Sequence, residues 1–176
     1  MTVLIEKRVH GIDHVGLTVP DIEKATTFFK KALAGEVIYD TFTKSEPKRD
    51  SPETQHRLGI SPDMAQRAIR MLGFPNGPQI ELFEYDGNEQ SPPIRSSDLG
   101  WNHVAFYTDD IYATLEAVED SGGNRLADPK PLSGLEAGDG NLFCYIRTPW
   151  GSTLELISYP TSQPYIKEAP REKWQV

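Results

Sequence analysis

Residues 13–22 read DHVGLTVPDI, and residues 102–111 read NHVAFYTDDI. A second pair of stretches is closer still: residues 77–85 read GPQIELFEY, and residues 151–159 read GSTLELISY. Both halves of the chain have the same order: a strand-like stretch with a histidine, a helix-like stretch, and a strand-like stretch with a glutamate after a Pro-x-Gly turn. Because chance rarely matches order, spacing and residue type together, the sequence predicts two copies of one module.

Hydrophobic periodicity predicts the elements of the first module. Residues 10–19 alternate as a strand does, and Asp21 is placed to cap a helix that has one apolar stripe and ends at Gly35. A polar stretch runs from Lys44 to about Met64. The other strands of this module are expected at 36–43, 66–74 and 78–85.

The second module repeats this pattern. A strand at 101–108 precedes a helix at 110–120, and Gly122 and Gly123 end that helix. Three further strands are expected at 124–127, 142–148 and 152–159. The fold class is therefore predicted to be α+β, with two tandem βαβββ modules. The expected boundaries are a first module at 1–85, a linker at 86–99, a second module at 100–160 and a polar C-terminal tail at 161–176.

Composition excludes several classes of protein. Hydrophobic residues make up 38% of the chain and charged residues 25%, which suits an ordinary globular core. The net charge of −8 repels phosphate backbones, so we expect no nucleic acid partner. No apolar stretch approaches the length of a membrane helix or of a secretory signal, so no membrane partner and a cytoplasmic location are expected. The single cysteine, Cys144, excludes an intrachain disulfide and a cysteine-based zinc site.

Four side chains that can bind a metal stand at matching positions in the two modules: His14 and Glu81, then His103 and Glu155. Because strand side chains alternate between faces, each of them lies opposite an aliphatic face suited to receive a helix. Taken singly, such a histidine is more often a core residue, and such a glutamate faces water. An unpaired buried carboxylate is costly, however, and the repetition of both residue types favours one divalent metal ion shared by all four.

The two remaining histidines have no counterpart in the other half of the chain. His10 is predicted to begin a strand and His56 to lie on a surface loop. The segment 128–143 has three glycines and two prolines and is too long for a tight turn. Two interpretations stay open for it, a binding loop or lid and a plain surface excursion.

The quoted stretches, together with TPWGSTLELISY at 148–159, resemble the vicinal oxygen chelate superfamily. This superfamily includes glyoxalase I, methylmalonyl-CoA epimerase, extradiol dioxygenases, and fosfomycin and bleomycin resistance proteins. The resemblance covers about residues 10–160. It implies the glyoxalase/bleomycin resistance/dihydroxybiphenyl dioxygenase fold, in which two βαβββ modules curve mixed sheets around one metal ion.

The resemblance also implies roles for the four residues. His14 and His103 match the first-strand ligands of the two modules, and Glu81 and Glu155 match the last-strand ligands. Glyoxalase I and the epimerase have Glu or Gln at the position of Glu81, whereas dioxygenases and fosfomycin enzymes leave it without a ligand. Glu81 therefore favours the lyase and epimerase branch. The chain departs from glyoxalase I in having no recognisable glutathione site.

The implied activity is that of a metal-dependent lyase or isomerase that abstracts a proton next to a metal-bound carbonyl or hydroxyl. The substrate is expected to be a small molecule with adjacent oxygens. Glu155 is the candidate base, and Glu81 could serve the opposite face of the reacting carbon. Two imidazoles and two carboxylates suit Zn, Ni, Co, Mn or Fe.

Two alternatives remain for the function. One is an Fe(II) dioxygenase, in which Glu81 would crowd the metal. The other is a metal-free binding or resistance protein of the same fold, a type that typically lacks the full ligand set. Because the family commonly dimerises, we expect a homodimer, and the metal site can lie within one chain or between two.

Overall fold

The computed structural model describes residues 11–88, 90–167 and 169–173. The first module consists of β1 (His14–Thr18), α1 (Ile22–Leu33), β2 (Glu36–Phe42), α2 (Pro52–Leu58), β3 (Ala65–Gly73) and β4 (Gln79–Asp86). The second consists of β5 (Val104–Tyr107), α3 (Ile111–Asp120), β6 (Asn124–Arg125), β7 (Lys130–Pro131), the short 3-10 helix η1 (Gly134–Glu136), β8 (Leu142–Arg147) and β9 (Thr153–Ser158). A second 3-10 helix, η2 (Pro164–Lys167), follows. The predicted α+β class with two βαβββ modules is confirmed.

Each module forms one mixed sheet, and the two sheets have the same strand order. The first sheet is ordered β1-β4-β3-β2 and the second β5-β9-β8-β6, with β7 also paired to β8. In each sheet the strand that begins at the module's histidine (β1) or directly after it (β5) runs parallel to the strand that carries the glutamate. Gly16 pairs with Glu81, and Ala105 pairs with Glu155. The modules therefore match in residue pairing as well as in element order.

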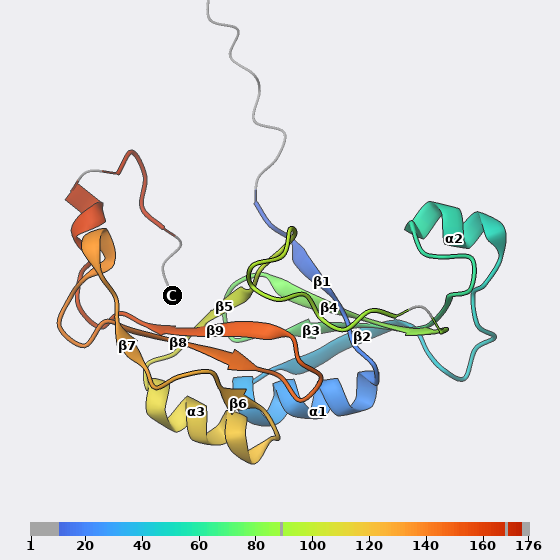
Figure 1. Cartoon of the computed structure of the whole chain (residues 1–176), viewed down its shortest axis with the longest axis horizontal. Helices are drawn as coiled ribbons and strands as arrows, with labels where there is room; N and C mark the ends of the chain where they lie inside the picture. Colours follow the sequence, from blue (N-terminus) through green and yellow to red (C-terminus); the bar gives the residue numbers. More distant parts are fainter. Residues whose placement is uncertain (1–10, 89, 168, 174–176) are drawn as a thin grey trace, which may run out of the picture.

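The two helices α1 and α3 lie side by side against the same side of the two sheets (Figure 1). Buried residues of both modules form one hydrophobic core between the helices and the sheets. Phe28 and Phe29 of α1 contact the ring of Trp150 in the second module, at centroid distances of 5.5 and 5.9 Å. Burying one large apolar side chain stabilises a fold by roughly 1.5–3 kcal/mol, so these aromatic contacts hold the modules together.

The start of α1 follows the prediction, and its end does not. The Asp21 carboxylate accepts the backbone N–H groups of Glu23 and Lys24, as expected of a helix cap. At the other end Ala34, and not Gly35, takes the left-handed conformation, with a φ of 53°. Gly35 has a different role, since a Cβ there would lie 3.2 Å from atoms of Phe29 and Phe74.

The polar stretch from Lys44 to about Met64 contains a helix that the periodicity did not predict. Ser51 caps α2 and Gly59 ends it in the left-handed conformation. His56 lies exposed on this helix, so its assignment to a loop was wrong; His10 lies outside the described residues. Figure 1 shows α2 at one end of the molecule and η1 and η2 at the other, all on the side of the sheets opposite α1 and α3. Within the described ranges, no helix is long and apolar enough to cross a membrane.

Candidate metal centre

The structure brings the predicted ligands together in two separate pairs. In the first module His14 Nε2 lies 3.3 Å from Glu81 Oε2. In the second, His103 Nε2 lies 2.9 Å from Glu155 Oε2. The shared register explains both pairs, because small residues, Gly16 and Ala105, stand beside the glutamates and leave each carboxylate free to reach towards its histidine.

The two pairs do not meet within one chain. Among the described residues, no group of three or more His, Cys, Asp or Glu side chains is placed to hold one metal ion. Within each pair an imidazole nitrogen nevertheless lies beside a carboxylate oxygen, and these are donor atoms that first-row divalent metals accept. Each predicted histidine therefore lies beside the predicted glutamate of its own module, and among the described residues of one chain the two pairs do not meet.

Two residues at these pairs were missed by the sequence reasoning. The Asp13 Oδ2 atom lies 2.8 Å from His14 Nδ1, and the Asn102 Oδ1 atom lies 2.8 Å from His103 Nδ1. The repeat itself contained the evidence, because an Asp or Asn stands directly before each aligned histidine. Each histidine thus has an oxygen acceptor on one nitrogen and a glutamate near the other.

The second pair lies in the more enclosed environment. The Glu155 side chain is 13% exposed, against 19% for Glu81. Burial raises the pKa of the Glu155 carboxyl, and the neighbouring His103 opposes that rise. Tyr145 pairs with Glu155 across β8 and β9, and its ring lies 5.1 Å from that of His103. Burial, and then the Glu155 charge, raise the pKa of the Tyr145 phenol. Sequence reasoning missed Tyr145, although its strand parity placed it on this face.

Glu84 shows what the opposite face of the same strand does. It lies three residues beyond Glu81 on β4 and is buried. Its carboxylate accepts the backbone N–H of Ile22 at 2.7 Å, and Lys44 Nζ lies 2.7 Å from its other oxygen. Glu84 therefore anchors the start of α1 to the sheet and is not part of the histidine face.

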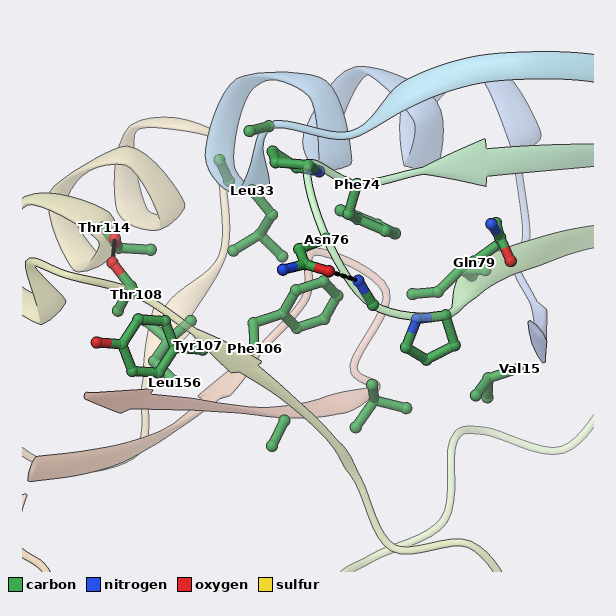
Figure 2. Close-up of a pocket in the computed structure, with 18 residues that line it drawn as sticks. Val15, Leu33, Phe74, Asn76, Gln79, Phe106, Tyr107, Thr108, Thr114 and Leu156 are labelled. Atoms are coloured by element: carbon green, nitrogen blue, oxygen red, sulfur yellow. Dashed lines mark hydrogen bonds between the residues drawn. The ribbon is translucent and has the colours of Figure 1, made fainter. Parts of the chain in front are cut away.

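A cavity of about 360 Å³ lies between the two modules, on the helix side of the His strands. Figure 2 shows Leu33, Phe74 and Asn76 of the first module on one side of it and Phe106 of the second module on the other. None of the four predicted ligands lines this cavity. The candidate chemistry therefore lies away from this cavity.

Comparison with known proteins identifies the class. Residues 13–145 match the model of the glyoxalase/bleomycin resistance protein/dioxygenase superfamily. The chain belongs to this superfamily, and the resemblance seen in its repeated motifs is confirmed.

Individual relatives differ in their reactions. A 2-epi-5-epi-valiolone epimerase from an Actinomyces species is 32% identical over 161 residues, which cover 90% of this chain and 84% of that protein. The lactoylglutathione lyase of Haemophilus influenzae is 24% identical over 144 residues, which cover 82% of this chain and 89% of the lyase. A glyoxalase family protein from Bacillus cereus has a similar fold, with a TM-score of 0.68 at 17% identity, covering 88% of this chain and 97% of that one.

Proposed function

We propose that this protein is a divalent-metal-dependent epimerase that inverts a carbon next to the carbonyl group of a small hydroxyketone. The observation that carries this proposal is the repeated His–Glu pair on the ligand face of each sheet. The relative with 32% identity is named for an epimerisation of valiolone, a ketone by its name, and the match extends over most of both chains. A lyase of the lactoylglutathione type is the second candidate, because a relative of that name matches and the same proton removal would serve both reactions.

His14, Glu81, His103 and Glu155 are the residues that would hold the metal. They fit a dication, since two neutral imidazoles and two carboxylates balance its charge and supply nitrogen and oxygen donors. When bound, such an ion polarises neighbouring oxygens of a substrate and stabilises negative charge that develops on them.

The chain's own carboxylates supply the proton transfer. Glu155 takes the proton from the reacting carbon, and burial supports this role because a raised carboxyl pKa lies closer to the working pH of a general base. Glu81 serves the opposite face, where a proton returns to the same carbon with inverted configuration. One proton leaves and one arrives, so the epimerisation needs neither an oxidant nor water. Glu81 also disfavours the dioxygenase alternative, because it would take a coordination position that oxygen needs.

A homodimer completes the site in this proposal. Since one chain keeps its two His–Glu pairs apart, the pair of one copy would face the other pair of its partner, and a two-fold axis would generate two such sites. Large apolar side chains stand exposed directly before the strands next to the histidines: Ile12 is 74%, Leu99 100% and Trp101 94% exposed. Exposed large apolar groups are typical of a contact surface, and a second copy of the chain is the partner that the incomplete site requires.

The test combines metal content with isotope exchange. Protein purified without chelator is analysed for metals and then incubated in D₂O with 2-epi-5-epi-valiolone or with the hemithioacetal of methylglyoxal and glutathione. We expect bound divalent metal, deuterium at the carbon next to the carbonyl, and loss of both in His14→Ala and His103→Ala. His56→Ala removes an exposed histidine from α2 and should change neither property. Equal metal content in all three variants would overturn the site assignment; exchange of the hemithioacetal alone would favour the lyase.

A further inference from the structure

We infer that Asp13 and Asn102 are positioning residues that select the metal-binding nitrogen of each histidine and make the two halves of the site unequal. This inference rests on the proposed metal-dependent function. It starts from the hydrogen bonds of the two Nδ1 atoms and not from the ligand set itself. Neither Asp13 nor Asn102 is a ligand in the proposal, so each would act only through its histidine.

The orientation of Asn102 determines which nitrogen of His103 donates a hydrogen bond to it. The Asn102 side-chain amide donates Nδ2–H to the backbone carbonyl of Ser96, which leaves Oδ1 facing His103 Nδ1 at 2.8 Å. Because an amide oxygen only accepts hydrogen bonds, His103 Nδ1 must carry the hydrogen. The nitrogen left to bind a metal is therefore Nε2, which lies 2.9 Å from Glu155 Oε2.

The same reasoning applies to His14, with a charged acceptor. The Asp13 carboxylate accepts the Nδ1–H of His14 at 2.8 Å and leaves Nε2 free towards Glu81. In both modules the nitrogen that could bind a metal therefore lies beside a carboxylate oxygen, so a single cation could bind to both atoms. A carboxylate acceptor increases the basicity of an imidazole more than a neutral amide does, so His14 is the stronger of the two nitrogen donors.

The linker between the modules contributes to the second half-site. Ser96, which accepts from Asn102, lies in a turn closed by Arg95 and Asp98. The Arg95 backbone N–H donates to Asp98 Oδ2 at 2.8 Å, and its guanidinium donates to Asp98 Oδ1 at 2.9 Å. A reversed Asn102 amide would place its oxygen against the Ser96 carbonyl oxygen, which cannot donate, so this contact fixes the orientation of the amide. The orientation of His103 thus depends on the linker, whereas that of His14 depends only on its neighbour.

The first measurement uses metal-free protein. Long-range ¹H–¹⁵N spectra distinguish the two neutral histidine tautomers, and we expect the Nδ1–H form for both His14 and His103. Asp13→Ala should mix the tautomers of His14 only, and Asn102→Ala those of His103 only. Asp50→Ala removes an exposed carboxylate that pairs with Lys48, and serves as the control that changes neither ring.

The second measurement is the affinity for Zn²⁺ or Co²⁺ in competition with a chelating dye. Removing an outer partner of a metal-bound histidine typically weakens binding about 10–100-fold, and we expect that loss in Asp13→Ala and Asn102→Ala. Asn102→Asp should tighten binding and Asp13→Asn should weaken it, since each changes the charge of the acceptor and keeps its shape.

Unchanged tautomers, or affinities within about twofold of wild type in both alanine variants, would overturn the positioning role. Equal affinities in Asn102→Asp and Asp13→Asn would overturn the inequality of the two halves. A wild-type protein that binds no divalent metal would instead refute the proposed function, and the tautomer spectra of the metal-free protein would still judge the roles of Asp13 and Asn102.

Discussion

A mixture of two inactive variants tests whether the metal site is shared between chains. His14→Ala breaks the first half-site of a chain, and His103→Ala breaks the second. Each variant alone forms dimers in which both shared sites lack one histidine. A mixed dimer is different, because the intact first module of one chain meets the intact second module of the other, while the two damaged modules meet each other. One of its two sites is therefore complete.

The size of the recovery follows from this geometry. Random exchange between equal amounts of the two variants yields about half mixed dimers, each with one working site of two, so about a quarter of the wild-type activity should return. Mixed dimers isolated with two different affinity tags should reach about half of it. Deuterium exchange into the substrate and bound metal are measured on the same samples, and light scattering gives the mass of each species.

The matched control mixes His14→Ala with Glu81→Ala. Both changes damage the first module, so every dimer in that mixture has a broken ligand pair in each site, and no activity should return. Equal recovery in the two mixtures would show that the rescue does not come from shared sites. Tagged mixed dimers of the His14 and His103 variants that stay inactive and metal-free would refute the shared site directly.

Three further predictions concern single positions. Glu155→Gln should keep its metal and lose about 10²–10⁴-fold in deuterium exchange, whereas Glu81→Gln should lose less; wild-type exchange in the Glu155 variant would refute its role as base. Asp21→Ala should cost about 1 kcal/mol of unfolding free energy, measured with urea. Backbone N–H groups lower the pKa of Asp21 in the folded protein. The stability that Asp21 adds should therefore be full above the ordinary carboxyl pKa and disappear as the pH falls through the lowered pKa. A stability difference between wild type and Asp21→Ala that does not change with pH would contradict this. Gly123→Ala should lower the unfolding free energy by about 1–3 kcal/mol, since its Cβ would lie 2.8 Å from a valine methyl and 2.9 Å from a carbonyl oxygen. Gly11→Ala is the control and should cost little stability, because nothing lies within 4 Å of its Cβ. Equal thermal midpoints of the two variants would contradict the tight packing at Gly123.

The faces on which the histidines and glutamates lie could be predicted from the sequence because they depend only on local rules. Strand parity places Glu81 on one face of β4 and Glu84 on the other, and the structure shows one beside a histidine and the other anchoring a helix. Strand parity within a module cannot say whether the two His–Glu pairs meet. The relative placement of the modules is determined by contacts between them, such as Phe28 against Trp150, which no periodicity within one module records.

The missed helix α2 has an equally physical explanation. Seven residues give it little room for an apolar stripe, and Gln55 is its buried residue. The Gln55 side chain donates to the backbone carbonyls of Pro62 and Met64, so hydrogen bonds rather than an apolar face hold this helix to the chain. Its caps were visible in the sequence, Ser51 before a proline and Gly59 at the end, and they were the evidence that a search for hydrophobic periodicity passes over.

The differences between the two modules matter as much as their repetition. An epimerase needs one group that takes a proton and another that acts on the opposite face, so two identical half-sites would serve it poorly. The shared register gives both glutamates the same backbone position, yet Met71 stands beside Glu81 while Tyr145 stands beside Glu155. Burial raises the pKa of the Glu155 carboxyl, which suits the proton acceptor. On the histidine side, the charged acceptor belongs to the first module, where in the proposed function it would strengthen His14 as a metal donor. The substitutions that break the symmetry of the repeat thus fall on the residues that would divide binding from proton transfer.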